Sequence, residues 1–259
     1  AHFRTLIDLK LEQAGAIVEV VPSDMEDPDE LHEELVYRSS VRNFNYLALC
    51  SESGELEMLD GTQLQLADPE PFFKSLRNNE KKVAVGRDTF GNEVVLFGVN
   101  AAYPMKNGEN SMALVAAVPI EYISTMLGTD EENALIYSYI IRRDGSFIVG
   151  DISDEYPDYF SSLYQRYQTD DREEIDAFIQ ALSTAMNNKE VYMGLQNFGG
   201  SSQQIYCTPL PYSEWHLVTI LPFGPLNETV ESLDRSRTIA TVCVCAVIFV
   251  VILLIFYIY

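Results

Sequence analysis

Residues that carry enzymatic chemistry are scarce in this chain of 259 amino acids, which has three histidines, four cysteines and one tryptophan. None of His2, His32 and His216 is paired with a cysteine or a second histidine at metal-ligand spacing. No CxxC, GxGxxG or GxxxxGK[ST] motif occurs. The sequence therefore lacks a metal site, a phosphate-binding loop and a nucleophile with its base, and it predicts a region without catalytic activity, cofactor or metal.

Basic residues are also few, because 17 Lys and Arg face 39 Asp and Glu and the formal net charge is −22. Such a surface repels the phosphates of nucleic acids and of anionic lipids. We therefore expect no nucleic-acid partner. Adjacent carboxylates such as Glu173 and Glu174 are typical of a solvated face in so acidic a chain.

The last residues, Ile239 to Tyr259, contain no charge, no proline and no glycine. A helix of this length covers roughly 30 Å, the hydrocarbon thickness of a bilayer. The sequence predicts a transmembrane helix over 239–259. The chain begins without an initiator Met, so we expect a second membrane helix before Ala1. Outside the span only Cys50 and Cys207 remain, and we expect them to be core residues rather than a disulfide.

Two helices are predicted at the start of the chain. Residues 1–21 carry an apolar stripe at spacings of four and three: Ile7, Leu11, Ala14, Val18 and Val21. This stripe either packs on the helix's own domain or also pairs with a second copy in a homodimer. Residues 23–44 read as an acidic helix, with Ser23 or Asp27 as its cap and Pro28 in its first turn.

From residue 44 the pattern changes to short strands. Two strands in 45–59 flank a turn at 52–54, and a short helix follows in 68–79. Three further strands, in 81–86, 93–105 and 111–120, lead to a helix over 121–128. The sequence of 134–222 repeats this order, with a longer helical stretch over 155–188.

The repeat has one sharp motif, because residues 83–91 and 191–199 both read V-x-x-G-x-x-x-F-G. These patterns predict an α+β fold: a long N-terminal helix and two tandem modules, each an antiparallel sheet with helices on one side. The predicted domains are a helical stalk (1–43), a membrane-distal module (44–128), a membrane-proximal module (129–223) and a juxtamembrane helix with the span (224–259). An apolar stripe of Leu226, Val230 and Leu233 makes residues 224–238 an amphipathic helix.

With this order of elements the chain resembles the double Cache family, the tandem PAS-like extracellular sensor domains of bacterial transmembrane receptors. The resemblance implies that residues 1–238 are extracellular at the plasma membrane. It also implies that the distal module binds a small molecule and that the proximal module passes the signal on.

The run IIRRDGSFIVG, with Tyr159-Phe160 downstream, resembles the proximal module of clostridial sensors that continue into a histidine kinase, often a hybrid one. The expected output is therefore a histidine kinase of a two-component system, and the alternatives are a diguanylate cyclase or a chemoreceptor. Arg235 and Arg237 beside the span leave a tail-anchored cytosolic interaction protein as a further alternative.

Relatives that bind amino acids commonly carry R-x-W-Y at the start of the short helix, where this chain reads Glu70-Pro71-Phe72-Phe73. The arginine that would hold an α-carboxylate is absent, and the strand 116–119 lacks the family's aspartate. The candidate ligand-binding residues are Asp60, Glu70, Phe72, Phe73, Arg87 and Tyr103. For each an ordinary role stays open: the phenylalanines as core, and Arg87 as one half of a surface ion pair.

Overall fold

The computed structural model describes residues 2–222 apart from 26, 60–62, 68, 79, 128–135, 151–156, 168–171 and 199–200. Within these residues no helix is long and apolar enough to cross a bilayer. The predicted span over 239–259 and the predicted helix over 224–238 lie outside the described residues. So do the boundaries predicted after residues 128 and 223.

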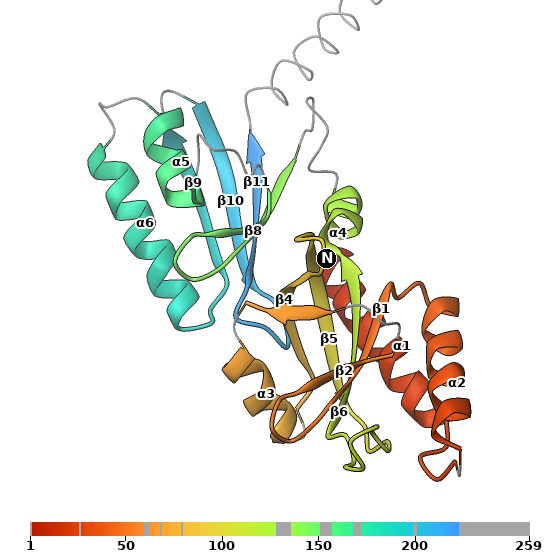
Figure 1. Ribbon diagram of the computed structural model, residues 1–259. Coiled ribbons are helices and arrows are strands. Elements are labelled where there is room, and N and C mark those ends of the chain that lie inside the picture. The colour runs from red at the N-terminus through yellow and green to blue at the C-terminus, as the bar shows by residue number, and fades with distance from the viewer. Residues whose placement is uncertain are drawn as a thin grey trace, which may run out of the picture.

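The first half of the chain forms a six-stranded antiparallel sheet in the order β2-β1-β6-β5-β4-β3 (Figure 1). Its strands are β1 (Tyr46–Cys50), β2 (Leu56–Met58), β3 (Leu64–Leu66), β4 (Lys82–Asp88), β5 (Glu93–Asn100) and β6 (Ala113–Pro119). Five of them lie where the sequence predicts strands. β3 was not predicted, because three residues show no periodicity and the strand is held by pairing with β4.

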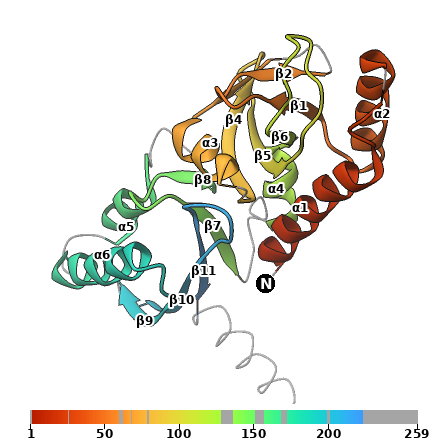
Figure 2. The ribbon, with the colours of Figure 1, turned by 90° about the horizontal axis from the view of Figure 1, so that it is seen from below.

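Helices cover both faces of this sheet, so the prediction of helices on one side is wrong here. The helices α1 (His2–Val20), α2 (Pro28–Val41) and α4 (Ile120–Leu127) share a hydrophobic core with one face. The helix α3 (Pro69–Arg77) packs on the other face, against β4 and β5 (Figure 2). The physical reason is the sequence of β5 and β6, which is apolar without alternation and is buried on both sides.

The apolar stripe of α1 packs on the chain's own sheet. Ile7, Leu11, Ala14 and Val21 are at most 2% exposed and belong to the same core cluster as β5. Of the two interpretations that the sequence left open, the structure thus supports packing within the domain. Asp27 caps α2 as predicted, because its carboxylate accepts from the amide of Asp29 at 2.9 Å.

The second half repeats the topology as a five-stranded antiparallel sheet in the order β8-β7-β11-β10-β9. Its strands are β7 (Tyr137–Ile141), β8 (Phe147–Val149), β9 (Tyr192–Phe198), β10 (Ser201–Pro209) and β11 (His216–Pro222). The helices α5 (Tyr159–Arg166) and α6 (Arg172–Asn187) share a core with one face of this sheet. The predicted repeat in element order is therefore seen in the described residues, among which β3 is the one strand of the first sheet without a counterpart.

The two sheets are joined by backbone and side-chain contacts. The amide of Val83 in β4 donates to the carbonyl of Tyr212 at 2.8 Å. Glu214 pairs with Lys82 of β4 at 3.6 Å, with Lys189 at 3.3 Å and with Arg143. Trp215 of the second half also lies in the core cluster of the first. The loop that leads into β11 is therefore bonded directly to β4.

Candidate functional site

In the described part of the first module a pocket opens toward each end of α3. The pocket near its first turn, here the Phe73 pocket, has a volume of about 560 Å³. Its walls come from the hairpin of β1 and β2, from β3 and from α3, and are Gly54, Leu56, Met58, Gln63, Leu64, Gln65, Leu66, Pro69 and Phe73. None of these described residues is charged. Such a lining suits a neutral molecule with an apolar surface.

Phe73 is held in this pocket by close packing on a turn. Gly54 has φ +89°, and a Cβ there would lie 2.8 Å from Cδ2 of Phe73. The ring of Phe72 packs edge-on against that of Phe73, with centroids 5.7 Å apart. Because glycine alone combines positive φ with this approach, the turn and α3 fix the position of the Phe73 ring.

The structure does not bring all six predicted residues together. Phe73 lines the pocket, whereas Phe72 is 1% exposed and packs in the core beneath it. Glu70 is exposed on the first turn of α3 and is not part of the pocket wall. Asp60 lies outside the described residues.

Arg87 and Tyr103 lie elsewhere in the module. Arg87 is exposed and its Nη2 pairs with Oε1 of Glu93 at 3.4 Å, which is the surface ion pair left open from the sequence. Tyr103 belongs to the core on the opposite face of the sheet. Its hydroxyl donates to the carbonyls of Val21 at 3.0 Å and Val18 at 3.3 Å, and burial raises its pKa to about 12. It fastens the loop after β5 to the end of α1.

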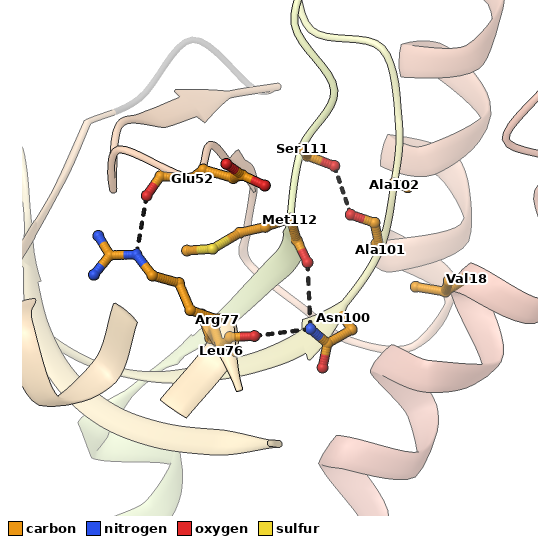
Figure 3. A pocket seen from close by; sticks show the side chains of 9 residues that line it. All are labelled: Val18, Glu52, Leu76, Arg77, Asn100, Ala101, Ala102, Ser111 and Met112. Carbon is orange, nitrogen blue, oxygen red and sulfur yellow. Dashed lines mark hydrogen bonds between the residues drawn. The ribbon is translucent and has the colours of Figure 1, made fainter. Parts of the chain in front are cut away.

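The second pocket, here the Arg77 pocket, lies at the last turn of α3 and has a volume of about 640 Å³ (Figure 3). It is lined by Val18, Glu52, Leu76, Arg77, Asn100, Ala101, Ala102, Ser111 and Met112. The sequence did not indicate this pocket. Its residues come from five separate segments, and no single segment carries a motif.

Among the described residues, the buried cysteines and histidines lie on separate helices and strands. Cys50 and Cys207 are buried free thiols on β1 and β10, and burial raises the pKa of each to about 12. In the described part of the chain no group of three or more His, Cys, Asp or Glu side chains is placed to hold a metal. Nε2 of His32 lies 3.6 Å from Glu57, whereas His216 is buried on β11 and its surroundings lower its pKa, chiefly through burial.

The solved structures similar to this chain include ligand-binding domains of chemoreceptors. The ligand-binding domain of the amino-acid chemoreceptor PctC of Pseudomonas aeruginosa, in complex with GABA, is 13% identical with a TM-score of 0.56, over 85% of this chain and 93% of that one. The domain of chemoreceptor CtaA of Pseudomonas fluorescens, in complex with L-isoleucine, is 11% identical with a TM-score of 0.55, over 85% and 86%.

A third similar structure is the extracellular domain of the predicted histidine kinase mmHK1S-Z3. It is 12% identical with a TM-score of 0.56, over 90% of this chain and 93% of that one. No family model and no curated protein matches the sequence. The chain thus shares the fold of these ligand-binding and extracellular domains, which agrees with the fold that the resemblance to the double Cache family implied.

Proposed function

We propose that this chain is the extracellular sensing region of a bacterial membrane receptor that binds a small neutral molecule in the Phe73 pocket. The main observation that supports this proposal is the presence of the Phe73 pocket. It lies between α3 and the sheet of the first module, and none of its described lining residues is charged. The fold shared with receptor ligand-binding domains supports the same function.

The chain's own residues favour neutral ligands over α-amino acids. An α-carboxylate is best held by a guanidinium in a bidentate pair, and no described residue of the Phe73 pocket supplies one. Glu70, which stands where the resemblance places an arginine, adds negative charge on the first turn of α3. We therefore propose that standard α-amino acids bind this pocket weakly or not at all.

The signal is proposed to leave through β11 and the predicted helix and span beyond it. Contacts of Glu214 and Tyr212 with β4 give the distal module a direct mechanical connection to the proximal one. In the full receptor we propose two copies whose juxtamembrane helices shift relative to each other, with a histidine kinase as the output. The buried stripe of α1 is not the surface for this pairing.

Thermal unfolding of the chain in lipid nanodiscs tests the binding claim. A ligand at one hundred times its Kd adds about 2.7 kcal/mol to the free energy of unfolding, which raises the Tm measurably. A panel of neutral metabolites and a panel of standard amino acids are compared. Stabilisation by neutral compounds is expected, and stabilisation by several standard amino acids instead would overturn the proposed ligand class.

A further inference from the structure

The second sheet exposes an apolar surface along β9, on the face opposite its helices. Side chains of a strand alternate between the two faces, and Tyr192 and Phe198 pack against α6 (Figure 2). Val191, Met193 and Leu195 therefore point to the other face, where they are 65%, 65% and 66% exposed. Single exposed apolar residues are ordinary, but three that follow one another on one side of a strand form a patch. These three residues are here called the β9 patch.

The β9 patch lies at an edge of the sheet that is open to other chains. Met193 stands opposite Tyr206 of β10 and Leu195 opposite Gln204, and both β10 residues are half-buried and uncharged. Among the described strands β9 is the last of its sheet. Natural edge strands commonly carry lysine or proline, which keep other chains away, and β9 has neither. This surface therefore lacks the residues that usually protect an edge from contact.

The distribution of charge indicates which partner this surface fits. Residues 191–213 contain no Asp, Glu, Lys or Arg, although 22% of the chain is charged. With a net charge of −22, two copies of the chain repel each other wherever their acidic surfaces meet. A second copy can approach the uncharged β9 patch without that repulsion. A basic partner would instead be attracted to the acidic surfaces, so the uncharged face favours a second copy.

We infer that the β9 patches of two copies pack face to face around a two-fold axis that runs parallel to β9 and β11. The direction of the axis rests on the proposed function, in which both chains leave β11 toward the same membrane. β9 and β11 run in the same direction, because each is antiparallel to β10. Antiparallel edge-to-edge pairing of two β9 strands would need a perpendicular axis, which turns β11 of one copy away from the membrane. Packing of the two faces keeps both copies upright.

The size of the β9 patch predicts that the pairing is weak in solution. Three side chains cover less than the roughly 800 Å² that each partner of a typical stable complex buries. Two copies in one membrane are held at a high effective concentration, so a small contact is sufficient there. The β9 patch thus provides a pairing surface that the buried stripe of α1 does not.

Single cysteines test this contact in the full chain, reconstituted in liposomes at a low protein-to-lipid ratio. Each variant is made in a Cys243→Ser, Cys245→Ser background, and the two remaining cysteines are buried. The cross-linker is a bismaleimide that spans about 10 Å, the spacing of packed sheets. Met193→Cys should give cross-linked dimers. Ala177→Cys is the matched control, because it is exposed on α6 over the opposite face, and it should stay monomeric.

A charge in the β9 patch should separate the copies. Leu195→Glu, added to Met193→Cys, should lower the cross-linked fraction at least about tenfold, because each carboxylate would lose water and face its own copy. Leu195→Met keeps the surface apolar and should leave the fraction unchanged. Equal cross-linking of Met193→Cys and Ala177→Cys, or of the Leu195→Glu and Leu195→Met variants, would overturn the pairing. Quenching of a fluorophore on Met193→Cys by spin-labelled lipids would also overturn it, since the patch would then contact the bilayer.

The outcome for the pairing is distinguishable from that for the proposed ligand. All of the cysteine and patch variants lie outside the first module, and the cross-linking is measured without ligand. Loss of the pairing would therefore leave binding at the Phe73 pocket standing. Failure of neutral compounds to stabilise the protein would not change the expected cross-linking.

Discussion

Gly54 and Phe73 form a close contact in the first module, and Gly145 and Phe160 form the equivalent contact in the second. A Cβ on Gly54 would lie 2.8 Å from the Phe73 ring, and a Cβ on Gly145 would lie 2.5 Å from the ring of Phe160. Both glycines lie in the turn of the module's first hairpin with positive φ, and both rings are on the helix that follows. The two modules therefore share this contact between a turn glycine and a helix phenylalanine, as well as an order of strands.

Gly54→Ala should accordingly destabilise the protein more than a substitution at a glycine with the same backbone and open surroundings. Gly108 is the matched control, with φ +85° and no atom within 4 Å of the position that a Cβ would occupy. We expect Gly108→Ala to cost about 1–2 kcal/mol from the left-handed backbone alone. Gly54→Ala should cost a further 1–3 kcal/mol, roughly the scale of overpacking. Urea unfolding measures both, and equal losses would refute the role of the ring.

Removing the hydroxyl should change the free energy of unfolding differently at two buried tyrosines, Tyr103 and Tyr159. Tyr103 and Tyr159 are 1% and 2% exposed, but only the Tyr103 hydroxyl has hydrogen-bond partners among the described residues. Burial raises the pKa of Tyr159, so its hydroxyl stays neutral. Tyr103→Phe should lower the free energy of unfolding by about 1–2 kcal/mol, and Tyr159→Phe should leave it unchanged or raise it by about 1 kcal/mol. A loss in Tyr159→Phe equal to that in Tyr103→Phe would contradict this assignment.

Asp88 should make stability depend on pH. Burial acts to raise its pKa, but hydrogen bonds from the side chains of Asn92 and Tyr46 and from the amides of Asn92 and Phe90 outweigh it and lower the pKa. A carboxyl with a lowered folded-state pKa contributes stability that is present above its unfolded-state pKa, which is about 4 for aspartate. That stability is lost as the pH falls through the folded-state pKa.

Asp88→Asn should therefore be less stable than wild type at neutral pH, and the difference should shrink as the pH falls through the folded-state pKa of Asp88. Chemical unfolding across the acid range measures this difference. Glu12→Gln, on the exposed face of α1, is the control and should show no such trend. A difference between wild type and Asp88→Asn that stays constant with pH would exclude Asp88 as the source.

Local signals in the sequence identified most of the fold. Pro28 after Asp27 marked the start of α2, and the glycines at 54 and 145 marked two hairpins that the structure contains. The shared V-x-x-G-x-x-x-F-G motif located β4 and β9, yet its phenylalanines differ: Phe90 is 84% exposed in a turn, and Phe198 is fully buried at the end of β9. A short motif thus predicts the strand without predicting the environment of each side chain.

The sites were less predictable, because they depend on contacts between distant segments. Phe73 could be found from its place at the start of α3, where the resemblance directs attention. The Arg77 pocket joins α1, the turn at Glu52 and the loop before β6, so no spacing in the sequence indicates it. Arg87 was one of the candidate ligand-binding residues, but Glu93 lies opposite it in the β4–β5 ladder and pairs with it.

The most direct test of the sensing claim is to locate the binding of a neutral ligand. The best stabiliser from the neutral panel is titrated into wild type, Leu66→Trp and Lys74→Trp in nanodiscs, with affinity measured by calorimetry. Leu66 is a half-buried residue of the Phe73 pocket and packs against the same core cluster as Phe73, so tryptophan there occupies the pocket, whereas Lys74 is exposed and lies outside it. We expect Leu66→Trp to lose the ligand and Lys74→Trp to bind it as wild type does. Unchanged affinity in Leu66→Trp would contradict the proposed binding site.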